Sequence, residues 1–369
     1  MSFPTTQTAL VQEVYAEPLT LKTIPVPTVH HGSALIRTLY SGVASYAREI
    51  YNGTRHYSYE APIVPGFGAI GRIAALGPDA TYLKEGQLVY ADGMIHSRDN
   101  PDDIVLCGLT AGATSGAQKL MRETWHNGTW AEYVRVPLEN VFPLNEEKLS
   151  GLGYAIEELA TLTKYLAYGG LRDIDVRAGE TVVVAPATGA FGGAAVAVCI
   201  ALGARVIAMG RNKDALEALE STFGRNVKTV KITADVAHDV AALKSAANGP
   251  IDAVFEVSPP EAAKSTHIKS CIVALRRGGR MSLMGGIRED YPIPLGEVMR
   301  KNLVLRGTWM YSREQLLELI KMVETGVLKI GKKGGLKSFN VFPFSDWEKA
   351  FDTASDNARW DATVLFTPL

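Results

Sequence analysis

The amino-acid sequence predicts an α/β protein that combines a β-rich domain with a doubly wound parallel sheet. Short alternating or β-branched runs, separated by Gly and Pro, fill the chain from about residue 10 to residue 142. From residue 181 onward, apolar strand-like runs alternate with helical patterns. A glycine turn separates the first of these strands from the helix that follows. At 369 residues, the chain is long enough for two domains.

Composition places the chain among ordinary globular proteins and argues against polyanionic partners. Hydrophobic residues make up 47% of the sequence and charged residues 21%. The 38 Lys and Arg residues balance 39 Asp and Glu residues, so no broad positive field favours nucleic acid or an anionic membrane. The three cysteines are far apart, and the first 20 residues lack the basic and apolar runs of a targeting segment. We therefore expect a cytoplasmic protein that acts on a small molecule.

The second half of the chain has the alternation expected of a parallel sheet. Residues 181–204 carry no charge, but Pro186 and three glycines divide them into a strand, a turn and a helix, which argues against a membrane span. Strands are expected at 181–185, 205–209, 229–232, 253–256, 280–284 and 303–307, with helices at 192–202, 213–223 and 265–275. The tail is expected to hold helices at 312–326 and 344–354 and a strand at 362–367.

The remaining segments set the expected domain boundaries. Residues 145–168 have apolar side chains at helical spacing and are expected to form one bridging helix. Residues 93–127 are rich in glycine and polar side chains and are expected to form a loop. The chain then divides into a Rossmann-type nucleotide-binding domain at 149–307 and a β-rich substrate domain made of 1–148 and 308–369.

A nucleotide-binding turn is expected where the phrase VVVAPATGAFGG joins a buried strand to a helix. Gly189 and Gly192 take the second and third positions of a GxGxxG pattern whose first position holds Ala187. With Thr188 and Phe191 beside them, these glycines would let a pyrophosphate approach the bare amides of a helix N-terminus. The match is partial, and a glycine turn that only packs a helix against a strand has the same pattern.

The end of the next strand favours NADPH over NADH. Gly210 lies about 20 residues after the turn, where an acidic side chain would bind the adenosine ribose of NAD. Arg211, Asn212 and Lys213 follow it and offer space and positive charge for a 2′-phosphate. Basic residues at a helix start oppose the helix dipole, so a phosphate partner would account for them, although a solvated helix start is the alternative.

Two later strand ends are expected to flank the nicotinamide. FEVSPP and LMGG follow successive strands, at the edge where an open α/β sheet keeps its ligand crevice. Val257 and Gly285 lie in these phrases and are the expected contacts. Ordinary turn chemistry is the alternative explanation of both.

The order of five phrases resembles the medium-chain dehydrogenase/reductase superfamily. The phrases are SGVASYAREIYNG (41–53), VPGFGAIGRIAALG (64–77), GTWAEYVRVP (128–137), the glycine turn and RRGGRMSLMGG (276–286). The resemblance spans nearly the whole chain. It implies a GroES-like first domain, an inserted Rossmann domain and a C-terminal segment that rejoins the first domain. A homodimer joined through the edge strands of two Rossmann sheets is also what it implies.

The resemblance includes a zinc site whose ligands are missing here. Zinc-dependent relatives carry a Cys where this chain has Ala44, a His where it has Phe67, and a Cys or Asp near Leu162. A methyl, a phenyl and an isobutyl group provide no donor for zinc. The four-cysteine structural zinc lobe of the family is absent too. The sequence therefore predicts no metal site, and it resembles the zinc-free quinone reductases and enoyl reductases.

Reduction of a conjugated carbonyl suits a site without a Lewis acid, because the developing charge spreads into an enolate that a hydroxyl can stabilise. The resemblance places Tyr46 where zinc-dependent relatives have the Ser or Thr that touches the substrate oxygen, and Tyr57 is the second candidate. Either ring could instead fill a seam between the domains. Two alternatives to reduction of an enone, enal or quinone stay open: a zinc-free carbonyl reductase with a tyrosine proton donor, and an NADPH-binding module without turnover.

Overall fold

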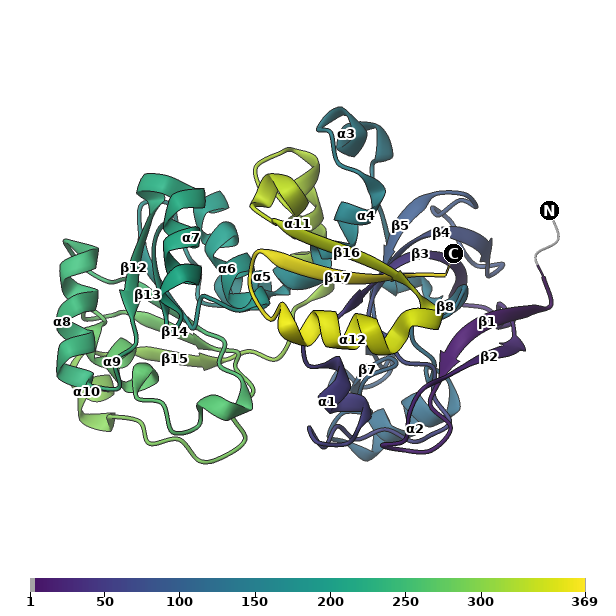
Figure 1. Ribbon diagram of the computed structural model, residues 1–369, viewed down its shortest axis with the longest axis horizontal. Helices are drawn as coiled ribbons and strands as arrows, with labels where there is room; N and C mark the ends of the chain where they lie inside the picture. Colours follow the sequence, from purple (N-terminus) through teal and green to yellow (C-terminus); the bar gives the residue numbers. More distant parts are fainter. Residues whose placement is uncertain (1–3, 369) are drawn as a thin grey trace. The chain divides into compact units, whose positions relative to one another are not determined.

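The computed structural model describes residues 4–368, which fall into two units (Figure 1). Unit 1 holds the described residues up to Thr163, together with Lys337–Ala358 and the chain from Ala362 onward. Unit 2 holds Lys164–Leu336 and the short segment Arg359–Asp361. The expected α/β class and the expected division into a β-rich part and a parallel-sheet part are both confirmed.

Unit 2 is built on a six-stranded parallel sheet in the order β12-β11-β10-β13-β14-β15. Every residue of β10 and β13 is buried, as expected for central strands that helices cover on both faces. The strands are β10 (Thr181–Ala185), β11 (Arg205–Gly210), β12 (Val227–Lys231), β13 (Ala253–Glu256), β14 (Arg280–Leu283) and β15 (Val304–Gly307). The first and fourth of these have the bounds that their apolar runs predicted, and the others differ by one or two residues.

Helices cover both faces of this sheet. The helices α8, α9 and α10 gather on one face, and α5, α6 and α7 lie on the other, with α11 packed on α5 (Figure 1). The helices are α5 (Tyr168–Asp173), α6 (Ala190–Ala201), α7 (Lys213–Phe223), α8 (Val236–Ala247), α9 (His267–Ala274), α10 (Leu295–Arg300) and α11 (Arg313–Glu324). The structure thus has the β-α-β architecture of a doubly wound fold.

The second expected domain boundary, at 307/308, is placed differently by the structure. Polar contacts join α11 and the residues before it to α5: Tyr168 donates to Glu318 at 2.6 Å, and Asp173 accepts from Thr308 at 2.9 Å and from Gln315 at 3.0 Å. In agreement with these contacts, unit 2 extends to Leu336. The first boundary lies after Thr163 instead of at 148/149.

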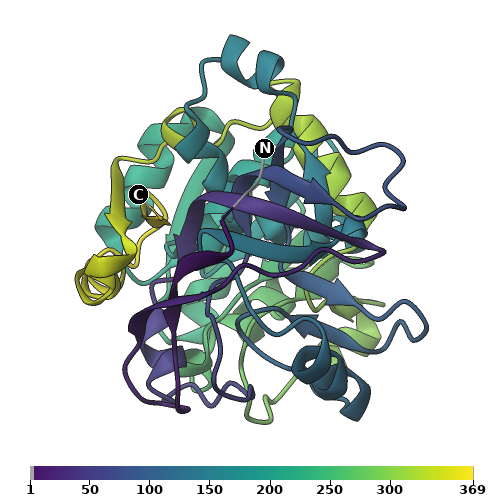
Figure 2. The same cartoon turned by 90° about the vertical axis from the view of Figure 1, so that its right-hand side faces the viewer.

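Unit 1 contains a seven-stranded sheet in the order β16-β17-β3-β4-β5-β9, with β8 paired to β3, and two small two-stranded sheets. One of the small sheets is the β1–β2 pair, the dark purple strands in Figure 2. The strands are β1 (Thr6–Val11), β2 (Thr20–Pro25), β3 (Ser33–Val43), β4 (Ala69–Leu76), β5 (Leu88–Ala91), β6 (Met94–His96), β7 (Ile104–Leu106), β8 (Tyr133–Pro137), β9 (Val141–Pro143), β16 (Ser338–Pro343) and β17 (Ala362–Thr367). Its helices are α1 (Ala47–Tyr51), α2 (Ser115–Glu123), α3 (Glu146–Gly151), α4 (Ile156–Leu159) and α12 (Trp347–Asp356).

Two sequence predictions for unit 1 are wrong. Residues 93–127 do not form a plain loop, because β6 and β7 pair there and Thr114 caps α2 by accepting from the Ala117 amide at 3.0 Å. Residues 145–168 do not form one helix but α3, α4 and a 3₁₀ segment at Ala160–Ala167 that leads into α5. The chain leaves α3 through Gly153, whose φ of 77° lies in the left-handed region and stops the helix.

The C-terminal segment rejoins unit 1, as the resemblance implied. β17 pairs antiparallel with β3 and parallel with β16, a strand that the sequence analysis missed.

Among residues 4–368, no helix is both long and apolar enough to cross a membrane.

Trp360 anchors the short segment Arg359–Asp361 in the core of unit 2. It is only 4% exposed, and its indole nitrogen donates to the Ala215 carbonyl at 3.2 Å. Its backbone amide donates to Thr188 in the glycine turn at 3.1 Å. A methyl group on Gly193 would lie 2.2 Å from the Trp360 Cβ, so glycine is required where α6 meets this ring.

We expect Trp360→Ala to lower the free energy of unfolding by about 3 to 5 kcal/mol, because a large buried ring is replaced by a cavity. Trp360→Phe keeps most of the packing and loses only the bond to Ala215, so it should cost about 1 kcal/mol. Urea unfolding measures both. Trp309→Ala is the matched control, because Trp309 is 56% exposed and its loss should change stability by at most about 0.5 kcal/mol. Equal losses for Trp360 and Trp309 would contradict the assignment.

Candidate functional site

The strand order of unit 2 reverses next to β10. This strand pairs in parallel with β11 on one side and with β13 on the other. The chain first proceeds from β10 to β11 and β12, then returns to the other side for β13, β14 and β15. The carboxyl ends of parallel strands share one edge, and the point of reversal is where open α/β sheets bind their ligands. All predicted cofactor residues follow the strands at this edge.

The glycine turn after β10 combines open space with close packing. Gly189 is the N-cap of α6, and a methyl group added to it would meet nothing within 4 Å. A methyl group on Gly192 would lie 2.1 Å from the Pro186 carbonyl oxygen, so this glycine lets the helix approach the strand. Thr188 and Phe191 are partly exposed on either side of Gly189. The turn therefore has room for a phosphate at the helix start, and its binding role stays a prediction.

The end of β11 lies against this turn. A methyl group on Gly210 would be 2.7 Å from Thr188 Cγ2, so two residues that were predicted from separate motifs lie side by side. Asn212 is the N-cap of α7, where its side chain accepts from the Ala215 amide at 3.0 Å. Lys213 forms an ion pair with Glu217 at 3.4 Å.

Arg211 differs from its two basic and polar neighbours. Its side chain is exposed, and within residues 4–368 it makes no hydrogen bond and no ion pair. Lys213 has an acidic partner and Asn212 is committed to capping the helix. Arg211 is thus the residue of this cluster whose charge is available to an anion.

A buried carboxyl group joins the ends of β13 and β14. The Glu256 carboxylate accepts from the Ser258 amide at 2.6 Å and from the Gly285 amide at 3.2 Å. Burial raises the pKa of Glu256, and these hydrogen bonds oppose the rise. Val257 lies between the bonded groups and donates its own amide to Ala185 at 3.0 Å. The two predicted nicotinamide contacts, Val257 and Gly285, are therefore held on one hydrogen-bonded wall.

His267 extends this polar network, and the sequence analysis missed it. The ring is 1% exposed, with Nε2 2.9 Å from the Ser258 hydroxyl and Nδ1 2.7 Å from the Ser265 hydroxyl. Burial and, to a smaller extent, the nearby charge of Arg211 lower its pKa to about 4, against the opposing effect of Asp239. The imidazole is thus neutral at pH 7. A lone His seven residues after FEVSPP carried no signal of this partnership.

In unit 1 the structure brings the two predicted tyrosines together. Tyr46 and Tyr57 both pack against the same hydrophobic cluster, beside Tyr51 and Tyr59. Burial raises the pKa of Tyr46, Tyr57 raises it further and Arg55 opposes the rise, so the hydroxyl stays protonated at neutral pH. The Arg55 guanidinium lies 4.3 Å from the centre of the Tyr46 ring.

Hydrogen bonds distinguish Tyr46 from its neighbours. The Tyr51 hydroxyl donates to Gly108 at 2.9 Å and the Tyr59 hydroxyl donates to Gln12 at 2.7 Å, so both serve the core. The Tyr46 hydroxyl makes no hydrogen bond in the described part of the chain. Tyr46 therefore differs from Tyr51 and Tyr59, whose hydroxyl protons are committed to the core.

The segments that carry zinc ligands in related enzymes come together in unit 1 of this chain, but they lack the ligand side chains. A methyl group on Gly42 would lie 3.8 Å from Thr163 Oγ1, and one on Gly68 would lie 3.4 Å from Thr163 Cγ2. Ala44, Phe67 and Leu162 are within two residues of these three positions. In residues 4–368, no group of three or more His, Cys, Asp or Glu side chains is arranged to hold a metal ion. This donor set does not fit zinc.

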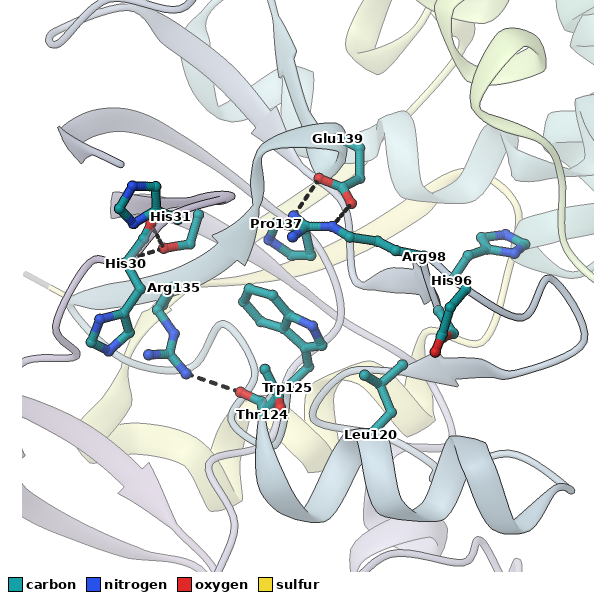
Figure 3. Close-up of a pocket in the computed structure, with 13 residues that line it drawn as sticks. His30, His31, His96, Arg98, Leu120, Thr124, Trp125, Arg135, Pro137 and Glu139 are labelled. Atoms are coloured by element: carbon teal, nitrogen blue, oxygen red, sulfur yellow. Dashed lines mark hydrogen bonds and ion pairs between the residues drawn. The ribbon is translucent and has the colours of Figure 1, made fainter. Parts of the chain in front are cut away.

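A separate hollow of about 300 Å³ lies on unit 1, between β8, the end of α2 and the loop at His30 and His31 (Figure 3). Arg135 crosses it, donating to the Thr124 carbonyl at 3.1 Å with its guanidinium 5.4 Å from the Trp125 ring (Figure 3). That contact neutralises the C-terminal end of α2 and gives Arg135 a structural task. No predicted site residue lines this hollow.

Comparisons with known proteins agree with this architecture. The family model described as "Alcohol dehydrogenase GroES-like domain" matches residues 30–146, and the one described as "Zinc-binding dehydrogenase" matches residues 190–325, together more than half of the chain. The chain is a medium-chain dehydrogenase/reductase. As a member of this superfamily it is an oxidoreductase.

Among its relatives in this superfamily are two bacterial dehydrogenases. An alcohol dehydrogenase from Geobacillus stearothermophilus is 25% identical over 87% of this chain and 90% of its own length. An L-threonine 3-dehydrogenase from Legionella pneumophila is 26% identical over 90% and 92%. The fold is shared with an alcohol dehydrogenase from E. coli CFT073 in complex with NADH, which has a TM-score of 0.79 at 16% identity and covers 99% of this chain and 100% of that one. A crotonyl-CoA carboxylase/reductase has a TM-score of 0.78 at 16% identity and covers 99% and 88%.

The low pKa of His267 predicts a pH-dependent stability. Its folded pKa of about 4 lies below the ordinary value of 6.5, so the unfolded chain binds more protons between these two values. Stability should fall as the pH drops from 6.5 to 4, by on the order of 3 kcal/mol from this residue alone. Urea unfolding at several pH values, compared with His267→Gln, isolates the effect. Parallel curves for the two proteins would show that His267 does not titrate in this way.

Proposed function

We propose that this medium-chain dehydrogenase/reductase is an NADPH-dependent, metal-independent enzyme that reduces the conjugated C=C bond of an enone, enal or quinone. One observation carries the proposal. The segments that hold zinc in related enzymes come together around Thr163 in this chain, but their side chains include no zinc ligands. A site without zinc ligands suits substrates in which the negative charge formed during reduction is delocalised, because one hydroxyl donor is then enough to stabilise that charge.

The carboxyl edge of unit 2 supports a phosphorylated nicotinamide cofactor. Gly189 leaves space at the start of α6 for a pyrophosphate, and the E. coli alcohol dehydrogenase of the same fold binds NADH. Arg211 supports the choice of NADPH, since among the described residues its guanidinium has no acidic partner where the 2′-phosphate is expected. Val257 and Gly285 would border the nicotinamide half. When bound, the cofactor supplies a hydride to the substrate.

Tyr46 is the proposed donor to the substrate oxygen. Its raised pKa keeps the phenol protonated, and its hydroxyl makes no hydrogen bond to any residue from 4 to 368. The oxygen of a conjugated carbonyl becomes negatively charged as the β-carbon is reduced, and a hydrogen bond from Tyr46 lowers the energy of that charge. Protonation of the α-carbon then completes a saturated carbonyl product. Tyr57 remains the second candidate.

A zinc-free carbonyl reductase is the second candidate function. The relatives from Geobacillus and Legionella are named alcohol and threonine dehydrogenases, which favours chemistry at a C–O bond. In this case Tyr46 would give its proton to the alkoxide itself.

A homodimer through β15 is also proposed. This strand forms one edge of its sheet and has Val304 53% exposed, and the neighbouring α10 exposes Leu295 (73%) and Met299 (69%). An exposed edge strand with apolar neighbours is suited to pairing with a second copy.

Arg211→Ala should weaken NADPH binding by about 10- to 100-fold, because a charge-assisted contact to the 2′-phosphate is lost. NADH has no such phosphate, so its dissociation constant should change by less than about threefold. Isothermal titration of both cofactors measures this difference. Lys213→Ala is the control, since Lys213 is already paired with Glu217. Equal losses for NADPH and NADH would remove the 2′-phosphate assignment.

The reaction itself is tested with NADPH and an enal such as cinnamaldehyde. The expected product is the saturated aldehyde, formed by metal-free protein whose zinc content is checked by elemental analysis. Tyr46→Phe should lower kcat by at least about 100-fold while leaving the NADPH dissociation constant unchanged, because only the donor to the oxygen is lost. Tyr57→Phe is the comparison. Exclusive formation of cinnamyl alcohol would favour the carbonyl reductase, and stoichiometric zinc would defeat metal independence.

A further inference from the structure

A short loop at the carboxyl edge of unit 2 is fixed at both ends. It connects β15 to α11 and comprises residues 308–312. The Thr308 amide donates to the Leu283 carbonyl at 3.1 Å, which ties the loop to β14. At its other end, Ser312 and Gln315 form a capping box. The Asp173 carboxylate binds both ends, accepting from Thr308 at 2.9 Å and from Gln315 at 3.0 Å.

The middle of this loop has a strained backbone. Met310 has a φ of 69°, in the left-handed region that side chains other than glycine rarely adopt. Its carbonyl oxygen packs closely against Gly169 in α5, because a methyl group added to Gly169 would lie only 2.5 Å from this oxygen. Tyr311 packs at the same place and is 6% exposed. Strained residues persist only where their surroundings determine them, and they concentrate at functional sites.

Trp309 is the residue that this arrangement leaves outside the core. Its side chain is 56% exposed, although the residues around it are anchored. Within residues 4–368 its indole makes no hydrogen bond and no contact with another aromatic ring. A single exposed aromatic residue is not unusual by itself. What requires an explanation is that the loop carrying it is anchored at both ends and strained at Met310.

The position of the loop indicates which part of the site Trp309 serves. The strand order places β11 and β12 on one side of β10, and β13, β14 and β15 on the other. Because Arg211 marks the adenosine half at β11, the nicotinamide half belongs to the side of β13 to β15. Trp309 follows β15, next to the β14 end that carries Gly285. It is thus an aromatic side chain at the edge where hydride transfer is proposed.

We infer that Trp309 is a specificity residue that stacks on the planar system of aryl-conjugated carbonyl substrates. This inference rests on the proposed function and names its substrate class: an enone or enal conjugated with an aromatic ring. An indole face binds flat π systems with little loss of side-chain entropy, and it contributes nothing comparable for a short alkyl chain. The residue is therefore expected to discriminate between substrates and not to take part in the transfer.

The test compares two substrates and three variants of the full chain. The substrates are 4-phenyl-3-buten-2-one and 3-penten-2-one, which share the enone and differ in the aryl group. Trp309→Ala should lower kcat/KM for the aryl enone by about tenfold, mainly through KM, and change that for the alkyl enone by less than about threefold. Trp309→Phe should retain most of the preference. Val327→Ala, which removes another exposed apolar side chain of unit 2, should change neither.

Two further measurements separate the possible failures. Calorimetric binding of the product 4-phenyl-2-butanone to protein saturated with NADP⁺ should weaken about tenfold in Trp309→Ala, whereas NADPH binding should not change. If the wild-type protein reduces neither enone, the proposed function fails while this binding measurement still tests Trp309.

An equal loss of kcat/KM for both substrates in Trp309→Ala overturns the inference, as does no loss of kcat/KM for either. Dissociation of a dimer in Trp309→Ala, measured by light scattering, would assign Trp309 to an interface instead.

Discussion

The parallel pairing of β10 with both β11 and β13 is the constraint on which the rest of the candidate site depends. It fixes which strands lie on each side of the reversal point and directs every strand end to one edge. Residues 189, 211, 257, 285 and 309 come from segments up to 120 positions apart in the chain, yet all follow strands that end there. Without the register of these central strands, the glycine turn would be an isolated turn and Arg211 an ordinary surface charge.

The edge is held by a buried polar network. The Glu256 carboxylate joins the amides of two strand ends, and His267 fixes the Ser258 and Ser265 hydroxyls. Such groups are costly to bury unless each finds a partner, and a satisfied network then defines a single arrangement of the backbone. The backbone that Val257 and Gly285 share is therefore held in place by paired polar groups.

Glycines at this edge have different physical tasks. Gly189 keeps a space open, whereas Gly192 and Gly193 allow backbone and the Trp360 ring to come closer than any side chain would permit. A motif written only as glycines does not separate these tasks. The same holds for tyrosines in unit 1: within the described part of the chain, the hydroxyls of Tyr51 and Tyr59 donate hydrogen bonds and that of Tyr46 does not. In both cases the function of a residue depends on which neighbour the fold brings to it.

The sequence by itself determined the α/β class, the glycine turn and the bounds of strands such as β10 and β13, because buried parallel strands are continuous apolar runs that local pattern reveals. It also determined that Ala44, Phe67 and Leu162 offer no donor to zinc, since ligand chemistry is a property of the side chain. Only the tertiary structure decided that residues 93–127 and 145–168 form several short elements, because their pairing partners and helix ends depend on contacts distant in the chain. Only the tertiary structure distinguished Arg211 from Lys213, which is paired with Glu217, and revealed the partners of His267. The reason is that hydrogen bonds and ion pairs depend on proximity in space, which sequence spacing does not encode.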